Sequence, residues 1–467
     1  MKMGPDFKKP DLQLDQPEKF QYRPREATVV IPEDRWWEVF GDPEINGLVE
    51  KVLKNNPNLQ QAAARILELQ YQVIQTRADR FPTLGLQGGA QRQHEPESTF
   101  GPGVPIGGTV SQYGFSLPAS YEMDLWGKYA RAEEASRAQL LQEEENRLTL
   151  SQGLVAEAIS FYLQMQSLER RIQITLQSLK NYQESVTFVE RRYKRGLTSI
   201  LDLRQARRTL NQAKGNLPQL RQELGASQQA LAVILGEYPK TRKPYPQPED
   251  YYKKLKPVPP GLPSELLLRR PDIRAAEAQL MSLNAQIGVA KASRFPSIRL
   301  TGSYGYSSEE LFNLFTPGAA WSLAAALAQP LFDAGRLKAN QRAAEARYTQ
   351  GVAGYRKKVL DAFREVENAL LTRRKQIERR GDVFSFVVEA RATQRVAETR
   401  YMRGLVDYLT VLNAQQTRFG AEDQLLRVEL TILANRVTLH RALGGGWAVL
   451  PPVKGEETEG VSSYTIW

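Results

Sequence analysis

The chain has 467 residues, a formal net charge of +11 at pH 7, two histidines and no cysteine. This length is sufficient for a large core or two domains, and the absence of cysteine excludes disulfides and thiol chemistry. With His94 and His440 as the only histidines, a cysteine–histidine metal site is excluded as well. The sequence contains no phosphate-binding loop and no nucleophile motif. We therefore expect no enzyme, no cofactor and no metal site.

Charge and hydropathy exclude two further classes of protein. Acidic and basic residues are interleaved along the predicted helices, as on ordinary solvated faces. The positive net charge therefore does not predict a nucleic-acid partner. No stretch approaches the roughly 20 consecutive apolar residues of a membrane-spanning helix.

The N-terminal part of the chain is rich in proline and charge, and we expect an extended arm over residues 1–43. Two proline-free runs then predict a short helix over 45–55 and a longer one over 58–79. The word Arg80-Phe81-Pro82 ends the second helix, because a proline cannot continue the helical hydrogen-bond pattern.

After residue 82 the spacing of apolar residues changes from helical to alternating, which predicts β-strands. We expect strands at about 83–93 and 112–124, separated by a Gly/Pro-rich loop over 94–111, and at about 297–307 and 319–331. Apolar side chains fall on one face of these strands. They include Tyr113, Phe115, Leu117, Tyr121, Leu300, Tyr304, Trp321 and Leu323.

Strands of about ten residues with one apolar, aromatic-rich face are typical of membrane β-barrels. We therefore expect these eight side chains to face lipid. Four strands cannot close a barrel, because the smallest barrels have about eight. Several subunits would have to share one barrel, and three subunits would supply an even count of strands. The alternative is a soluble β-sandwich flap packed on the helices.

Two stretches predict helical hairpins of unusual length. The run 128–194 contains no proline, and about 67 residues at ~1.5 Å per residue correspond to a helix of about 100 Å. Gly196 is a natural helix stop after several basic residues. A returning helix follows, which completes a hairpin over 128–235. We expect a second hairpin over 336–443.

The two hairpins belong to a duplicated unit. The word Arg-Tyr-Lys-Arg-Gly-Leu over 192–197 recurs 208 positions later as Arg-Tyr-Met-Arg-Gly-Leu over 400–405. Repeats of about two hundred residues indicate a duplicated architecture. We expect the following parts: repeat 1 over 44–236, an equatorial linker over 237–262, repeat 2 over 263–444 and a tail over 445–467.

Several sequence words point to a known family. They are Trp36-Trp37 followed by Phe40-Gly41-Asp42-Pro43, Tyr-Glu-Met-Asp-Leu-Trp-Gly over 121–127, Leu-Pro-Ser-Glu-Leu-Leu over 262–267, Arg-Arg-Pro-Asp-Ile over 269–273, Gln-Pro-Leu-Phe-Asp-Ala-Gly over 329–335 and Ala-Leu-Gly-Gly-Gly-Trp over 442–447. In their number, order and spacing over about residues 4–447, these words resemble TolC-type outer-membrane efflux proteins (outer membrane factors), in particular the OprM/NodT-like lipoprotein branch.

The resemblance implies a fold that is mainly α with a membrane β-barrel. A homotrimer would form a twelve-stranded barrel in the outer membrane and a twelve-helix α-barrel in the periplasm. It would act as a passive exit duct for small molecules such as drugs, served by a periplasmic adaptor and an inner-membrane pump of the RND type. Type I protein secretion and a soluble helical scaffold are the alternatives. The branch has a lipidated cysteine near its mature N-terminus, where Met1 stands here, so anchoring to outer-membrane lipid stays open.

The starts of the returning helices contain the candidate gate. Asp407, Thr410 and Asn413 are three positions apart and share one helix face. The family narrows its pore near the hairpin turns, and the resemblance assigns a gate tyrosine to Tyr193 and Tyr401. We expect the tyrosine hydroxyls to hydrogen-bond between neighbouring hairpins. The alternative is that the acidic residues only start helices. The full candidate gate is Tyr193, Asp202, Gln205, Tyr401, Asp407, Thr410 and Asn413.

The two turns themselves are the expected contact for the adaptor. They are Arg195, Gly196 and Leu197 in the first hairpin, and Arg403, Gly404 and Leu405 in the second.

Overall fold

A computed structural model describes residues 2–12, 20–22, 35–98, 106–239, 267–316 and 318–445. The chain divides into two compact units. The first, here called the sheet unit, comprises the described residues of 1–12, 65–143 and 275–356. The second, the hairpin unit, comprises those of 13–64, 144–274 and 357–467. Met1, the predicted linker from residue 240 and the predicted tail from residue 446 lie outside the described residues.

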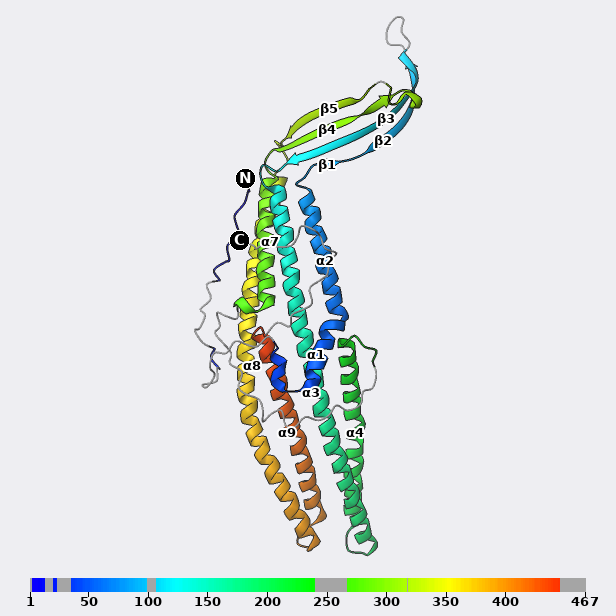
Figure 1. Ribbon diagram of the computed structural model, residues 1–467. Helices are drawn as coiled ribbons and strands as arrows, with labels where there is room; N and C mark the ends of the chain where they lie inside the picture. Colours follow the sequence, from blue (N-terminus) through cyan, green and yellow to red (C-terminus); the bar gives the residue numbers. More distant parts are fainter. Residues whose placement is uncertain are drawn as a thin grey trace. The chain divides into compact units, whose positions relative to one another are not determined.

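The sheet unit contains one antiparallel sheet (Figure 1). Strand β3 lies between β4 and the pair β1 and β2, and β5 pairs with β4. The strands are β1 (Thr83–Leu84), β2 (Gln87–Ser98), β3 (Ile106–Met123), β4 (Ser297–Ser308) and β5 (Ala320–Ala328). Because β1 and β2 both pair with β3, they occupy one edge position, and the sheet has four strand positions.

The strands differ from the prediction in their ends. The first predicted strand is interrupted after Leu84. The Gly85 N–H still donates to the Pro118 carbonyl at 2.9 Å in the same register, but Pro118 has no N–H with which to donate back. Strands β2 and β3 extend into 94–111, which we predicted to be loop; the register continues to the Ser98–Ile106 pair. Backbone pairing does not require alternating side chains, so the alternation pattern underestimated the length of these strands. Strand β5 ends before Pro330, which lacks the N–H that a ladder needs.

The register places the predicted lipid-facing residues on one side of the sheet. Leu117 lies opposite Tyr304, and Tyr304 lies opposite Trp321; directly opposed residues share a face. By the same register Tyr113, Phe115, Tyr121, Leu300 and Leu323 lie on that side. The opposite side is lined mainly by Ser, Thr, Gly, Ala and Gln.

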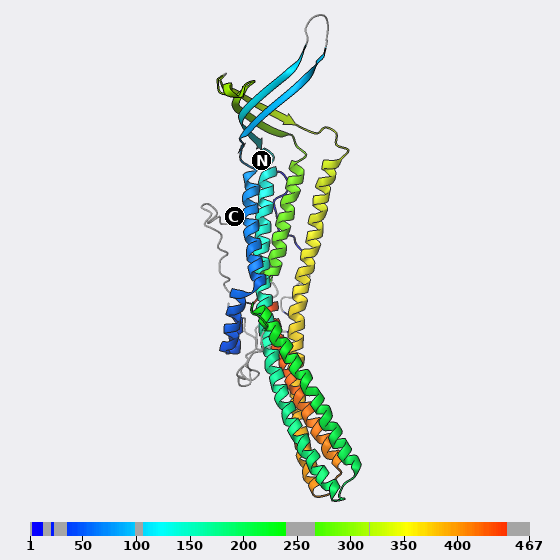
Figure 2. The same cartoon turned by 90° about the vertical axis from the view of Figure 1, so that its right-hand side faces the viewer.

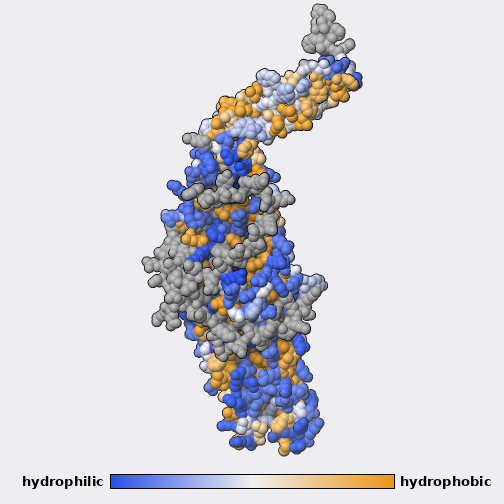
Figure 3. Space-filling view, in the orientation of Figure 1, coloured by the Kyte–Doolittle hydropathy of each residue, from blue (hydrophilic) through white to orange (hydrophobic). Residues whose placement is uncertain are grey.

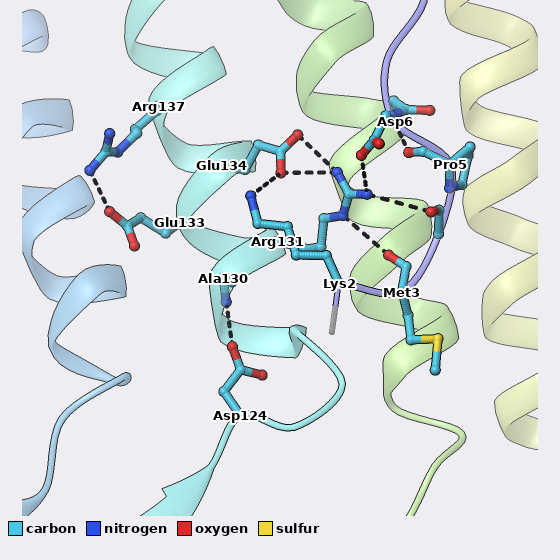
Figure 4. A network of polar contacts seen from close by, with 12 residues as sticks. Lys2, Met3, Pro5, Asp6, Asp124, Ala130, Arg131, Glu133, Glu134 and Arg137 are labelled. Atoms are coloured by element: carbon cyan, nitrogen blue, oxygen red, sulfur yellow. Dashed lines mark hydrogen bonds and ion pairs between the residues drawn. The ribbon is translucent and has the colours of Figure 1, made fainter. Parts of the chain in front are cut away.

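The N-terminal segment is part of the sheet unit (Figure 4). The buried Arg131 donates to the carbonyl oxygens of Met3 and Gly4 at 3.1 and 3.4 Å. It also binds the carboxylates of Asp6 at 2.8 Å and Glu134 at 3.0 Å. The segment therefore completes the hydrogen bonds of a buried guanidinium whose only other described partner is Glu134.

Helices α3 (Lys128–Lys194) and α7 (Pro271–Ala292) hold this segment, and the first turns of α8 (Arg336–Met402) belong to the same unit. From α7, the Asn284 side chain donates to the Pro5 carbonyl at 2.9 Å. Lys9 forms an ion pair of 2.6 Å with Glu277. Helix α2 (Pro57–Ala78) contributes its later turns to the same unit.

The hairpin unit is built from helices that return on themselves. The first hairpin is formed by α3 and α4 (Ile200–Ile234), the second by α8 and α9 (Tyr408–Ala442). The turns of both hairpins lie at the same end of this unit (Figure 2). Both turn glycines, Gly196 and Gly404, have φ near +70° (72° and 74°), a conformation that glycine adopts without steric cost.

A core at the other end of the hairpin unit joins a short 3-10 helix η1 (Trp36–Phe40), α1 (Pro43–Asn55) and the middle of α3. His440 of α9 stacks on Trp36 with ring centroids 5.1 Å apart. Burial lowers the pKa of His440 to about 3, so the imidazole is neutral at pH 7. Within the described ranges, no helix is both long and apolar enough to cross a membrane.

Candidate functional site

The two tyrosines of the repeated word have different surroundings. Tyr193 is 40% exposed, whereas Tyr401 is 8% exposed. The Tyr401 ring contacts Phe188 of α3 and Tyr408 of α9, with centroids 6.0 and 5.7 Å apart. The guanidinium carbon of Arg192 lies 5.2 Å from the centroid of the same ring. Tyr401 therefore joins the second hairpin to the end of the first.

This contact is aromatic and cationic. In the described part of the chain, the hydroxyl oxygens of Tyr401 and Tyr408 are buried without a hydrogen-bond partner. Burial raises the pKa of Tyr401, with a smaller contribution from Asp202, while Arg192 opposes the shift. Burial also raises the pKa of Tyr408 to about 12. Both phenols are neutral at pH 7. The hydroxyl link that we expected between neighbouring hairpins stays a prediction.

The two acidic residues cap helices. The side chain of Asp407 accepts from the backbone N–H and the hydroxyl of Thr410, at 2.9 and 2.5 Å. These bonds, that of the hydroxyl first, lower the pKa of Asp407. Asp202 forms a capping box with Ser199 and also accepts from the Thr198 hydroxyl at 2.5 Å. Helix starts favour such anions, so the helix-start role is present in both hairpins.

The remaining predicted gate residues follow these caps along their helices. Thr410 and Asn413 are exposed. Gln205 is partly buried, and its side-chain oxygen has no hydrogen-bond partner in the described ranges. The structure thus brings Asp407 and Thr410 into contact and places Asn413 one turn further along α9.

Both turns present apolar side chains to solvent. Leu197 is 60% exposed and Leu405 is 68% exposed. Backbone bonds close each turn. In the first turn, the Gly196 N–H donates to the Tyr193 carbonyl and the Leu197 N–H donates to the Arg192 carbonyl, both at 2.9 Å. Arg195, Arg403 and the glycines are exposed as well.

Sequence reasoning missed several residues of this region. Arg192 and Phe188, which hold Tyr401, were not selected, although Arg192 begins the repeated word. Exposed apolar side chains beside the turns were not selected as adaptor contacts either: Ile200, Leu201 and Met402. The sequence did contain a signal for this exposure. These apolar residues stand next to a glycine stop, at helix ends where no further turn can cover them.

Further polar links join the hairpins above the turns. The Gln416 side chain of α9 lies 3.4 Å from the Thr209 hydroxyl of α4. Arg171 of α3 binds Asp423 of α9 at 2.5 Å. Neither link was predicted, because partners on separate helices are more than two hundred residues apart in the sequence.

The apolar face of the sheet is the second candidate site. Trp321, Leu323 and Tyr304 are 76, 78 and 50% exposed, and apolar side chains gather along the sheet in Figure 3. An exposed, contiguous apolar surface of this kind marks a membrane or protein contact. The opposite, polar face gives the sheet the two-sided character of a strand layer between lipid and water.

The fold is that of known outer-membrane channels. The solved structure described as the outer-membrane channel OprN matches with a TM-score of 0.88 and 30% sequence identity, covering 95% of this chain and 99% of that one. Residues 48–237 and 262–445 match the family described as Outer membrane efflux protein. The chain belongs to this family, and its place is the outer membrane, as the resemblance predicted.

Two relatives show how far the similarity extends. The chain is 32% identical over 451 residues to the Cation efflux system protein CusC of Escherichia coli O6:H1, covering 95% of each chain. It is 35% identical over 428 residues to the Solvent efflux pump outer membrane protein SrpC of Pseudomonas putida, covering 91% of this chain and 90% of the relative.

Proposed function

We propose that the protein is the outer-membrane exit duct of a tripartite efflux system and exports small molecules passively. An inner-membrane pump of the RND type would supply energy and substrate through a periplasmic adaptor. Family membership and the relatives named for cation and solvent efflux support this proposal. The observation that carries it is the two-sided sheet joined to long helical hairpins.

The duct would be a homotrimer. The outer edges of the sheet, β2 on one side and β5 on the other, have no strand partner in the described chain. Exposed edges of this length need a partner, and four strand positions cannot close a barrel. Three copies would join edge to edge into twelve strands, with the apolar face toward lipid, and would surround one axis with twelve long helices in the periplasm.

The turn end of the hairpin unit would be the gate. Arg192 and Tyr401 would hold the second hairpin against the first and keep the opening narrow. Three copies of Asp202 and Asp407 would line the constriction while they cap their helices. Opening would follow when an adaptor binds the separated hairpins more tightly than the closed ones, since only differential affinity shifts such an equilibrium.

The exposed turns would be the adaptor contact. Leu197 and Leu405 are apolar tips flanked by Arg195 and Arg403, and an adaptor surface could cover both leucines. Substitution of both leucines by Asp should abolish efflux without loss of the trimer.

The test of the whole proposal is a measurement of mass and export. The detergent-solubilised protein should have a protein mass near that of three chains. Deletion of its gene from the native host should make the cells more sensitive to an exported compound. A water-soluble monomer with no dependence on detergent would refute the duct.

A further inference from the structure

The polar face of the sheet has very few charges. In the strand residues whose side chains are described, register places only Glu122 of β3 and Arg299 of β4 on this face as ionisable groups. The third charged strand residue, Arg92 of β2, pairs with Ser111 and therefore lies on the apolar face. Among the strand residues with described side chains, the rest of the polar face is small or uncharged, so their charge is concentrated in one place.

That place is a triad at the end of the sheet next to the helices. Glu122 and Arg299 are directly opposed in the register, and Arg299 Nη2 lies 3.4 Å from Glu122 Oε2. Lys128, the first residue of α3, places its Nζ 3.2 Å from the other carboxylate oxygen, Oε1. One carboxylate is thus shared by two cations.

Exposure decides which of these charges a passing ion would meet. The side chain of Glu122 is 16% exposed, that of Lys128 is 39% exposed and that of Arg299 is 61% exposed. The carboxylate is covered by its partners, while the guanidinium is open. The nearby Asp124 is occupied at the start of α3, where it accepts from the backbone N–H groups of Tyr129 and Ala130 at 3.2 and 2.8 Å.

We infer that the Glu122–Arg299–Lys128 triad is a charge-selective element of the duct and favours small anions over small cations. The inference rests on the proposed function, in which the polar face lines the aqueous pore. Of the three charges, the Arg299 guanidinium is the most exposed, so it sets the sign of the potential at this end of the polar face. Such a potential extends about 10 Å at 0.1 M salt, and three copies around one axis reinforce it.

The test is the reversal potential of the purified protein in planar bilayers under a KCl gradient. Arg299→Gln should shift the reversal potential toward potassium selectivity. Glu122→Gln, which uncovers both cations, should shift it toward chloride. Arg299→Lys should restore the wild-type value because it keeps the charge. Arg92→Gln is the matched control: it removes the same charge from the other face and should leave the reversal potential unchanged.

The outcomes separate this inference from the proposed function. Opposite shifts in the two glutamine variants, which shrink at about 1 M salt where screening is nearly complete, support the triad. Conducting channels whose reversal potential is the same in both variants overturn it and leave the duct intact. An equal shift in Arg92→Gln also overturns it, because the charge would then act from the wrong face. A wild-type protein that does not conduct refutes the proposed function itself.

Discussion

Arg192 and Tyr401 meet at the ends of two different long helices, with the guanidinium carbon 5.2 Å from the ring centroid. A cation over an aromatic face contributes about 0.5–2 kcal/mol, depending on how far it is desolvated. This pair is therefore a small but specific link between the hairpins.

From this link we predict that Arg192→Gln raises single-channel conductance in planar bilayers. Tyr401→Phe should leave conductance near the wild-type value, because the ring is kept and the lost hydroxyl has no hydrogen-bond partner in the described chain. The control is Arg400→Gln, at the equivalent position of the second hairpin. If Tyr401→Phe opened the channel as much as Arg192→Gln, the hydroxyl would be the link.

The two faces of β5 offer a second prediction. Leu323 lies on the apolar face and Ala324 on the polar face of the same strand. Leu323→Arg should destabilise the membrane-inserted protein by about 2–4 kcal/mol if the residue lies near the bilayer midplane. Ala324→Arg should cost much less. Denaturant unfolding in lipid vesicles measures both, and equal effects would contradict a lipid-facing apolar side.

Buried tyrosines predict a pH dependence of stability. Burial raises the pKa of Tyr182 and Tyr408 to about 12, above the ordinary value of about 10. Below about pH 10 both the folded and the unfolded chain keep these protons, and the stabilisation is complete. Between the two values only the unfolded chain loses them, so the free energy of unfolding falls as pH rises.

We therefore expect the melting temperature to fall progressively above about pH 10, with less dependence in the Tyr182→Phe and Tyr408→Phe double variant. The exposed Tyr193→Phe serves as the control and should not change the slope. Thermal melts monitored together with tyrosinate absorbance provide the measurement. Ionisation of all tyrosines near pH 10 in the folded protein would contradict the prediction.

The packing of the N-terminal segment against α3 and α7 predicts the effect of two glycine substitutions. A Cβ on Gly288 would lie 2.8 Å from the Met3 carbonyl oxygen and 2.8 Å from Arg131 Cγ. Gly288→Ala should therefore displace the segment and cost about 1–3 kcal/mol, as overpacking does. Gly354→Ala, a helical site with open space, should be neutral or stabilising by about 0.5–1 kcal/mol. Limited proteolysis of the N-terminal segment, with thermal melts, distinguishes the two; an uncleaved segment in Gly288→Ala would contradict this packing.

The long helices and the faces of the strands could be predicted, because local sequence patterns define them. The absence of proline and the glycine stop at Gly196 pointed to a long helix, found as Lys128–Lys194. Alternation placed Leu117 and Tyr304 on one face, and the register shows them directly opposed. The strand ends could not be predicted, because the paired residues there, such as Glu95 and Gly108, do not alternate between apolar and polar.

The candidate gate was less predictable than the fold. Tyr193 and Tyr401 occupy the same position in a repeated word, yet one is exposed and the other buried. Tyr401 is covered by Arg192 and Phe188 of α3. These residues lie more than two hundred positions earlier in the chain, so the sequence around Tyr401 gives no sign of them. A duplicated sequence therefore does not imply duplicated surroundings, and each repeat needs its own experimental test.

The contacts of the N-terminal segment also imply an order of folding. Residues Met3 to Lys9 bind Arg131 of α3, Asn284 and Glu277 of α7, and the Gly4 backbone lies against Gly288. These partners follow in the sequence by up to about 280 residues, and such distant contacts form slowly, because long loops must close first. During synthesis, this segment emerges before α7 and is thus among the last parts to be fixed. Until α7 is in place, it stays accessible to modifying enzymes and proteases.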